Sequence, residues 1–429
     1  MGTYRKRHYE YTIVACCFLL MFCNVGLPST SFSVYQPYLV ALPGVGDAAG
    51  SLIIGTRTFV SLICMILVGR YYNALDCRLG CFIAGALSAL GLFAFGLARS
   101  LPWLLVAAVI CGAAYGLGGM IGITLLVNRW FKTDVGTAAG LSAVGSGVAS
   151  IIIPVLAEYV IRTRSLQLSF WMEAAMALAI TVVVGLLLRN RPEDIGAVAH
   201  GAARHDADLG EGPSRKPVEQ HHEDGAHPEI HPTPVTDGGV CLSPAATRRF
   251  LLAMAFVGAI CVTAATFLSV LLVSEGFPHS FAALMLSVYG ICLTFSKAFT
   301  GRLYDMIGAV RGTIVSFTAI IVGLVCLCLT PTGLAVFAVA GSVLYGAGMA
   351  VGTIGIPIWS IQLSTAANRS TVIRQFQVGY ATGSFVYNLV PGVLMDLCGT
   401  YVASYAILVV FAGAALALIL TTYRQYTRD

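Results

Sequence analysis

The sequence predicts an all-α membrane protein with twelve transmembrane helices in two pseudo-symmetric six-helix halves. Composition is the first reason: of 429 residues, 57% are hydrophobic and only 10% are charged, whereas an average soluble domain has roughly 25% charged residues. The mean hydropathy of +0.83 agrees with this. The spacing of the apolar stretches is the second reason, and an internal repeat is the third.

The apolar stretches are long enough to cross a bilayer, which takes about 20 residues. The longest gap between them follows the sixth, so six helices are predicted on each side of it. We expect helices over 10–40, 47–68, 79–98, 101–127, 136–161, 168–189, 247–275, 281–299, 312–330, 333–363, 372–396 and 400–423.

The gap divides the chain into an N-terminal half (1–189), a linker (190–246) and a C-terminal half (247–429). The linker is rich in Pro, Gly, His and acidic residues, a composition typical of a flexible chain. Its histidines lack the spacing of a metal site, so no metal is expected there. No cofactor is expected either. The histidines stand at positions 200, 205, 221, 222, 227 and 231.

Lysine and arginine predict the orientation, because loops on the cytoplasmic side of a membrane are enriched in them. With the N-terminus in the cytoplasm, 20 of the 25 basic residues fall on that side, and only Arg99, Arg162 and Arg164 fall on the other. The remaining two, Arg57 and Lys297, lie inside predicted helices. Both termini are therefore expected in the cytoplasm, with the protein in the cell (inner) membrane.

The two halves contain similar segments at corresponding places. "AYGLGGMIG" (114–122) parallels "LYGAGMAVG" (344–352), and "LVGRYYNALDCR" (67–78) parallels "FTGRLYDMIGAVR" (299–311). Repeated six-helix halves are typical of secondary transporters, whose substrate site lies near the middle of the membrane.

The turn that closes the eighth stretch carries a motif. From Gly301 and Arg302 through Asp305 to Arg311, it is similar to the G-x-L-x-D-x-x-G-x-x-R/K loop of the major facilitator superfamily. The resemblance implies that these four residues form a gate on the cytoplasmic side. The alternative is an ordinary positive-inside anchor.

A degraded copy of this motif closes the second stretch. Gly69 and Arg70 are retained, whereas Asn73 stands where the acid is expected. Gly69 and Arg70 are included in the predicted gate, with a gating role and a purely topological one left equally open.

Two further segments narrow the resemblance. "NRWFKTDVGTAAGLSAVGSG" (128–147) and "RNRPEDIG" (189–196) resemble the monocarboxylate transporters and the oxalate:formate antiporters. This implies transport of a small organic anion by alternating access, with a proton or a counter-substrate as the coupling partner. The expected surroundings are a lipid bilayer, no nucleic acid partner and a functional monomer. No nucleophile–base set is found, so an enzyme is not expected.

Arg57 is a candidate substrate-binding residue on spacing alone. It lies ten residues after Asp47 and twelve before Gly69, about 15–18 Å from either end of its predicted helix. A cation at the centre of a bilayer costs about 2.5–3.5 kcal/mol, so we expect Arg57 to face a polar cavity. The alternative is a structural partner such as a backbone carbonyl.

Lys297 is a candidate through the resemblance, which implies a basic, carboxylate-binding residue four positions before Gly301. Its position near that glycine also allows the alternative that the side chain extends to the membrane surface. Tyr115 and Tyr345 stand at equivalent places in the repeats, where packing and binding remain equally open. Tyr380, in "GYATGSFVYN", completes the predicted site.

The sequence departs from these relatives at three positions. Ser29 stands where monocarboxylate transporters have a lysine, Leu293 where they have an acid, and Gly383 where the antiporters have a lysine. Proton coupling through that pair, and oxalate clamping by two cations in the antiporters' manner, are therefore not implied. The acids Glu158, Glu173, Glu275 and Asp396 are predicted to be anchors at helix ends.

Two alternatives to an anion carrier remain. One is an exporter that has the same fold and carries drug-like molecules or other metabolites. Against it, the fifth stretch lacks the G-x-x-x-G-P-x-x-G-G pattern of drug antiporters. The other is a membrane sensor that does not transport, which would have to signal through the linker.

Overall fold

The computed structural model describes residues 9–30, 32–200, 242–365 and 368–426. This part of the chain is almost entirely helical, and its β structure is one isolated bridge between Phe131 and His200. Eleven of its helices are long and apolar enough to cross a membrane. The prediction of an all-α membrane protein is confirmed.

The predicted span 372–396 does not meet that criterion of length and composition. Its residues form α18 (Arg369–Asn388) and α19 (Val390–Cys398), which pack against α11 and α4. Arg374, Gln375 and Gln377 make the start of α18 polar. Both helices nevertheless occupy the eleventh place in the chain order, so the layout of two six-helix halves is retained.

The N-terminal half is built from the following elements: α2 (Tyr9–Met21), η1 (Phe22–Thr30), η2 (Phe32–Tyr35), α3 (Gln36–Val40), α4 (Gly46–Ala74), α5 (Cys77–Leu97), α6 (Leu101–Gly118), α7 (Met120–Trp130), α8 (Val135–Thr163) and α9 (Leu166–Leu187). The first four succeed one another as one interrupted helix. Within it, η1 is a π-helix that contains Pro28, a residue that cannot donate a backbone hydrogen bond.

The C-terminal half repeats this plan with α11 (Pro244–Gly258), η4 (Ala259–Thr263), α12 (Ala264–Thr266), α13 (Leu268–Ser274), α14 (His279–Ile307), α15 (Ala309–Cys328), η5 (Thr330–Thr332), α16 (Ala335–Gly348), η6 (Met349–Gly352), α17 (Gly355–Gln362), α18, α19 and α20 (Val402–Tyr426). Its first helix is also interrupted by a π-helix, η4. The π-helices at matching places support the repeat predicted from the sequence.

Close glycine contacts hold equivalent helices together in the two halves. A side chain at Gly116 would meet Cys64 of α4, and one at Gly346 would meet Cys292 of α14. Glycine is needed at both places because the helix backbones approach within the space of a methyl group.

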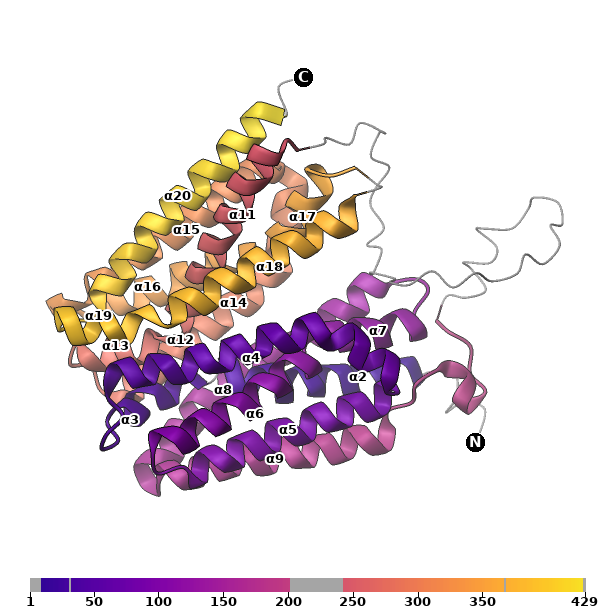
Figure 1. The fold of residues 1–429 in the computed structure, drawn as a ribbon, viewed down its shortest axis with the longest axis horizontal. Helices are drawn as coiled ribbons and strands as arrows, with labels where there is room; N and C mark the ends of the chain where they lie inside the picture. Colours follow the sequence, from indigo (N-terminus) through magenta and orange to yellow (C-terminus); the bar gives the residue numbers. More distant parts are fainter. Residues whose placement is uncertain (1–8, 31, 201–241, 366–367, 427–429) are drawn as a thin grey trace.

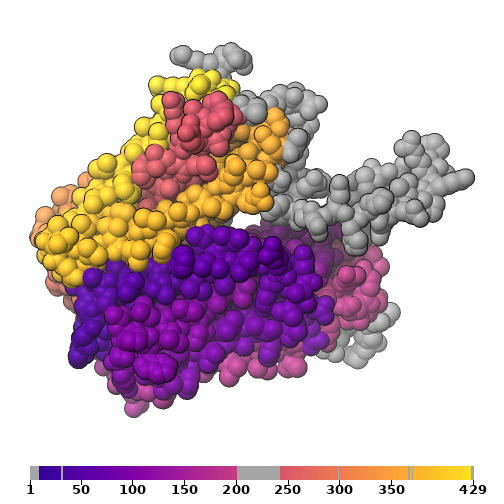
Figure 2. Space-filling view, in the orientation of Figure 1, coloured from indigo at the N-terminus to yellow at the C-terminus, as the bar shows by residue number. Residues whose placement is uncertain are grey.

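The two halves meet at one end of the molecule and diverge toward the other (Figure 1). At the meeting end lie α3, α13 and α19; at the other end lie α7, α17 and residues 190–200. We call the end with α3, α13 and α19 the closed end, and the end with α7, α17 and residues 190–200 the linker end. In the space-filling view, α4 and α18 lie against each other along the side nearest the closed end (Figure 2).

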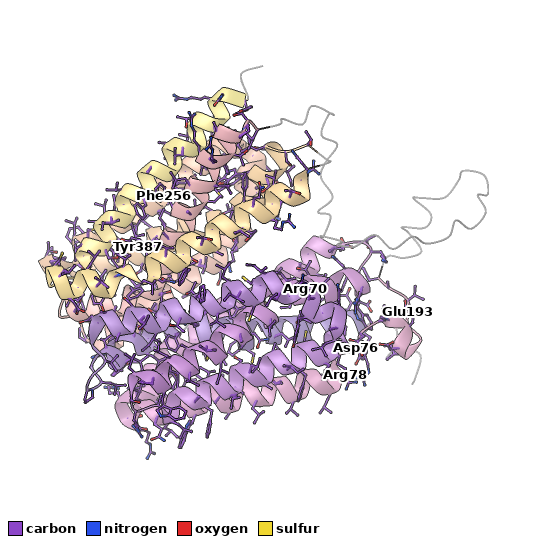
Figure 3. All side chains as sticks on the ribbon, viewed as in Figure 1. Arg70, Asp76, Arg78, Glu193, Phe256 and Tyr387 are labelled. Carbon is purple, nitrogen blue, oxygen red and sulfur yellow. The ribbon has the colours of Figure 1, made fainter. Side chains whose placement is uncertain are left out.

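The first residues of the predicted flexible linker are packed against the N-terminal half. Arg78 donates to the Gly185 carbonyl, its backbone N–H donates to Asn190, and Arg78 and Glu193 both lie at the linker end (Figure 3). His200 exchanges backbone hydrogen bonds with Trp130 and Lys132. Residues 201–241, which contain the rest of the linker except its last five residues, lie outside the described part of the chain.

Candidate functional site

The closed end is sealed by hydrogen bonds between the halves. The Tyr401 hydroxyl donates to Asp47 at 2.6 Å, and the Gly392 N–H donates to Ser51 Oγ at 2.6 Å. Burial and this bond to Asp47 raise the pKa of the Tyr401 phenol above its ordinary value, so the phenol remains a donor. The sequence did not mark these contacts, because they join single polar groups that belong to no motif.

Further contacts between the halves lie one to two turns deeper. Asn388 Nδ2 donates to Thr58 Oγ1 at 3.0 Å, and the rings of Phe59 and Phe385 pack with centroids 5.0 Å apart. Both pairs join α4 to α18. The closed region therefore extends from the start of α4 to the level of Arg57.

Arg57 is buried, with 4% of its surface exposed. Its Nη1 donates to the Pro28 carbonyl at 2.5 Å, and its guanidinium lies over the Phe32 ring at 5.0 Å. Because η1 ends two residues after Pro28, this carbonyl is one of those that a helix leaves without an internal partner. The structural partner considered as the alternative is thus present.

The other donors of Arg57 remain available. A guanidinium carries five N–H groups, and among the described residues Pro28 is the only one that accepts a hydrogen bond from the Arg57 side chain. No described acid pairs with it. A buried cation with free donors is chemically suited to a carboxylate.

Lys297 is half-buried on α14, and among the described residues its ammonium has no hydrogen-bond or ion-pair partner. The helix was expected to end near Gly301, but it continues to Ile307 and ends where Gly308 takes a positive φ of 82°. Lys297 therefore lies ten residues from the helix end, about 15 Å. The apolar span on this helix, His279–Lys297, ends at this residue, so the alternative in which the side chain extends to the membrane surface stays open.

The three predicted tyrosines occupy different surroundings. Tyr115 is half-buried and lies close enough to Arg57 and to Tyr380 of the other half to interact electrostatically with both. Tyr345 is different: it is fully buried, its hydroxyl donates to the Ile260 carbonyl, and its ring stacks on Tyr289.

Of the two alternatives left open for Tyr345, these contacts are the ones expected for packing. Its hydroxyl is already used by the carbonyl of a π-helix, and its ring is enclosed within the C-terminal half. Gly383, which stands where the antiporters have a lysine, faces a neighbouring helix. A side chain at this position would collide with the Ala255 carbonyl of α11, so the structure has no room there for a lysine.

The predicted gate residues lie at the linker end. Arg70, Arg302, Asp305 and Arg311 are exposed, and Asp305 forms no ion pair with any described residue. A side chain added at Gly301 would meet no described atom within 4 Å. The same holds at Gly69. Among the described residues, the structure thus shows no hydrogen bond or ion pair between the predicted gate residues.

One group that the sequence assigned to a helix end is in fact deeply buried. Glu173, the eighth residue of α9, is 0% exposed and accepts a hydrogen bond from Tyr35 at 2.6 Å. Its Oε2 has no hydrogen-bond partner among the described residues. The prediction of an anchor at the membrane surface is wrong, because α9 turns this side chain toward the first helix. Glu158 is also buried, and it accepts from Tyr38.

Two repeated six-helix halves, sealed together at one end and carrying cations near their junction, define a membrane transport protein. The family model described as the Major Facilitator Superfamily matches residues 14–386. The chain belongs to this superfamily.

Among curated proteins, the chain is similar to monocarboxylate transporter 14. The mouse protein (Mus musculus) is 27% identical over 139 residues, and the human protein (Homo sapiens) is 28% identical over 145 residues. Each match spans 32% of this chain and about a quarter of the relative (27% and 28%). The matched part is thus well short of either whole protein.

Solved structures match over nearly the entire chain. A mutant of the nucleoside transporter NupG has a TM-score of 0.71 at 15% identity and covers 97% of this chain and 99% of its own. A bacterial homologue of the human lysosomal transporter Spinster, inward-facing and occupied, has a TM-score of 0.68 at 14% identity, covering 98% of both chains. A D-xylose–proton symporter has a TM-score of 0.69 at 12% identity, covering 96% of both. At these identities the likeness shows the fold.

Proposed function

We propose that this protein is a secondary transporter that carries a small organic anion, a monocarboxylate or short dicarboxylate, by alternating access. The observation that carries the proposal is the pair Arg57 and Lys297. Both are basic residues within apolar helices, and neither has an acidic partner among the described residues. A bound carboxylate would supply the missing negative charge. The partial likeness to monocarboxylate transporter 14 supports the same substrate class.

The conformation fits one state of such a cycle. The halves are hydrogen-bonded at the closed end and diverge at the linker end (Figure 1). Most basic residues flank the linker end, which we place in the cytoplasm of a cell membrane by the positive-inside rule. The structure then corresponds to an inward-facing state.

Uptake by purified protein in liposomes tests the function. We expect a panel of labelled acids (formate, lactate, pyruvate, oxalate) to include at least one that enters faster than into empty liposomes and is competed by its unlabelled form. Xylose and uridine serve as neutral controls. Uptake of a neutral or cationic compound, without any of the acids, would favour the metabolite exporter and would contradict the anion proposal.

The gate yields a separate prediction. Asp305→Asn should shift the protein toward the linker-open conformation, because a carboxylate that closes this end by pairing with arginine loses its charge. Spin labels at Asn73 and Met306, exposed at the ends of α4 and α14, would report the linker end in a cysteine-free background. A second pair at Tyr159 and Leu397 would report the closed end.

The variant is expected to show a longer mean distance at the linker end and a shorter one at the closed end. Asp76→Asn is the matched control, because Asp76 immediately precedes α5 at the same end of the molecule. Identical distance distributions in Asp305→Asn and the parent would exclude a gating role for this carboxylate.

A further inference from the structure

Glu173 is a buried carboxyl group that the proposed anion site does not use. Tyr35 donates to its Oε1 at 2.6 Å, the Tyr35 hydroxyl lies 2.8 Å from Ser169 Oγ, and Ser169 Oγ donates to the Ala157 carbonyl at 3.3 Å. Its Oε2 is buried without a partner among the described residues. A buried carboxylate without a cation is strongly unfavourable. A single tyrosine hydrogen does little to offset this.

The described groups around Glu173 provide no cation. Tyr35 comes from η2 and Cys111 of α6 lies within electrostatic range. From η1, Cys23 faces the Ala177 carbonyl four residues along α9. From α8, Ala157 faces Ser169, whereas the next residue, Glu158, is bonded to Tyr38. The one arginine buried among the described residues is Arg57, and no hydrogen bond or ion pair joins it to Glu173.

The chain of hydroxyls is complete only when Glu173 is protonated. Then Glu173 donates to Tyr35, Tyr35 donates to Ser169, and Ser169 donates to the Ala157 carbonyl, so that three hydrogens serve three hydrogen bonds. When Glu173 is ionised, Ser169 must donate to Tyr35 instead, and the Ala157 carbonyl loses its side-chain donor. Gain of one proton at Glu173 thus reverses the donor–acceptor direction of these hydrogen bonds without moving a heavy atom.

The same short segment of the first helix also contacts the candidate anion site. Pro28 accepts from Arg57, the Phe32 ring lies under its guanidinium, and Tyr35 holds Glu173. Between the last two, Ser33 accepts from the Ser269 N–H of the C-terminal half at 3.4 Å. A change at Glu173 or at Arg57 therefore acts on a segment that also joins the halves at the closed end.

From these contacts we infer that Glu173 is the proton-binding site of the transport cycle. It takes up one proton together with one anionic charge at Arg57 and Lys297, and releases it when the closed end opens and the segment from Pro28 to Tyr35 moves. A cavity of about 30 Å³, lined by Gln167 and by the Phe170 ring that stacks on Tyr35, lies at the closed end. It can hold one water molecule. This inference rests on the proposed anion transport and adds its coupling ion.

The test compares Glu173→Gln with the parent in liposomes carrying a pH gradient. For one proton per anionic charge, a gradient of one pH unit supports about tenfold accumulation of a monocarboxylate, since tenfold corresponds to about 1.4 kcal/mol. We expect the parent to accumulate the anion and Glu173→Gln to lose accumulation while it retains anion binding and anion–anion exchange. Glu158→Gln, which alters the other buried carboxyl of this half, should behave as the parent.

Two further measurements are independent of accumulation. Anion binding to the parent in weakly buffered detergent solution should take up protons, and Glu173→Gln should remove this uptake. Tyr35→Phe should keep the proton site but shift the pH at which uptake is half-maximal. Accumulation by Glu173→Gln equal to the parent's, or no proton uptake by a parent that binds the anion, would overturn the inference and leave the anion function intact. A parent that binds no anion would instead refute the proposed function.

Discussion

Replacing Lys297 with glutamine is expected to abolish binding of the transported carboxylate. An ammonium and a carboxylate 4 Å apart interact by about 4 kcal/mol at an effective dielectric constant of 20, and a loss of this size corresponds to roughly a thousandfold in affinity. The neutral amide cannot replace this interaction. Lys297→Arg keeps the charge but changes its shape, so it should retain part of the affinity.

Arg57→Gln should weaken binding as well, and more for a dicarboxylate than for a monocarboxylate if the two cations share one ligand. Arg57 also holds the Pro28 carbonyl, so its loss should lower the melting temperature of the ligand-free protein. Lys297 has no described partner, and its replacement should leave that temperature nearly unchanged. Calorimetry and thermal-shift measurements on the same purified variants separate the two effects.

Arg424→Gln is a suitable control, because it removes a positive charge at an exposed position of α20, outside the predicted gate. It should bind the anion as the parent does. Binding of undiminished affinity by Lys297→Gln would show that the lysine is an anchor, and the proposed anion site would have to be abandoned.

Replacing Gly392 with alanine is expected to prevent closure of the end opposite the linker. The added methyl group would collide with the Asp47 carbonyl of the other half and crowd Ser51 Oγ. An extra methyl group in a well-packed contact costs about 1–3 kcal/mol, which shifts a two-state equilibrium by roughly 5- to 150-fold. Since the clash exists only while the halves are in contact there, the conformation with this end open is favoured.

Gly413→Ala is the control, because a side chain at this position of α20 would meet no described atom within 4 Å. Spin labels at Tyr159 and Leu397 should show longer distances in Gly392→Ala than in the control, and transport should fall while the melting temperature changes little. Distances that match the control would mean that the contact between Gly392 and Asp47 does not limit closure.

The sequence anticipated the features that depend on local pattern. Apolar length predicted the spans, the repeated segments predicted two equivalent halves, and the position of Arg57 inside a long apolar helix predicted that it needs a polar partner. It placed the end of α14 too early, however. The polar residues from Gly301 to Asp305 resemble a loop, yet nothing in them prevents helical geometry before Gly308.

Local sequence patterns could not predict which side of each helix faces which neighbouring helix. Tyr115 and Tyr345 occupy equivalent positions in the repeat, but only Tyr115 lies near Arg57, whereas Tyr345 is enclosed by η4 and Tyr289. Glu173 was assigned to a membrane surface for the same reason. Its burial depends on the packing of α9 against the first helix, a contact between residues 138 positions apart.

The sequence by itself determined that this chain crosses a membrane as two repeated helical halves with two basic residues inside them. The reason is that the hydrocarbon core of a bilayer disfavours charged side chains and requires each spanning segment to satisfy its own backbone hydrogen bonds, as a helix does. Only the tertiary structure decided which polar groups meet: Arg57 with Pro28, Glu173 with Tyr35, and Asp47 with Tyr401. Each of these pairs joins separate helices. Their partners are set by the rotation and tilt of packed helices, which a one-dimensional pattern of apolar residues leaves undefined.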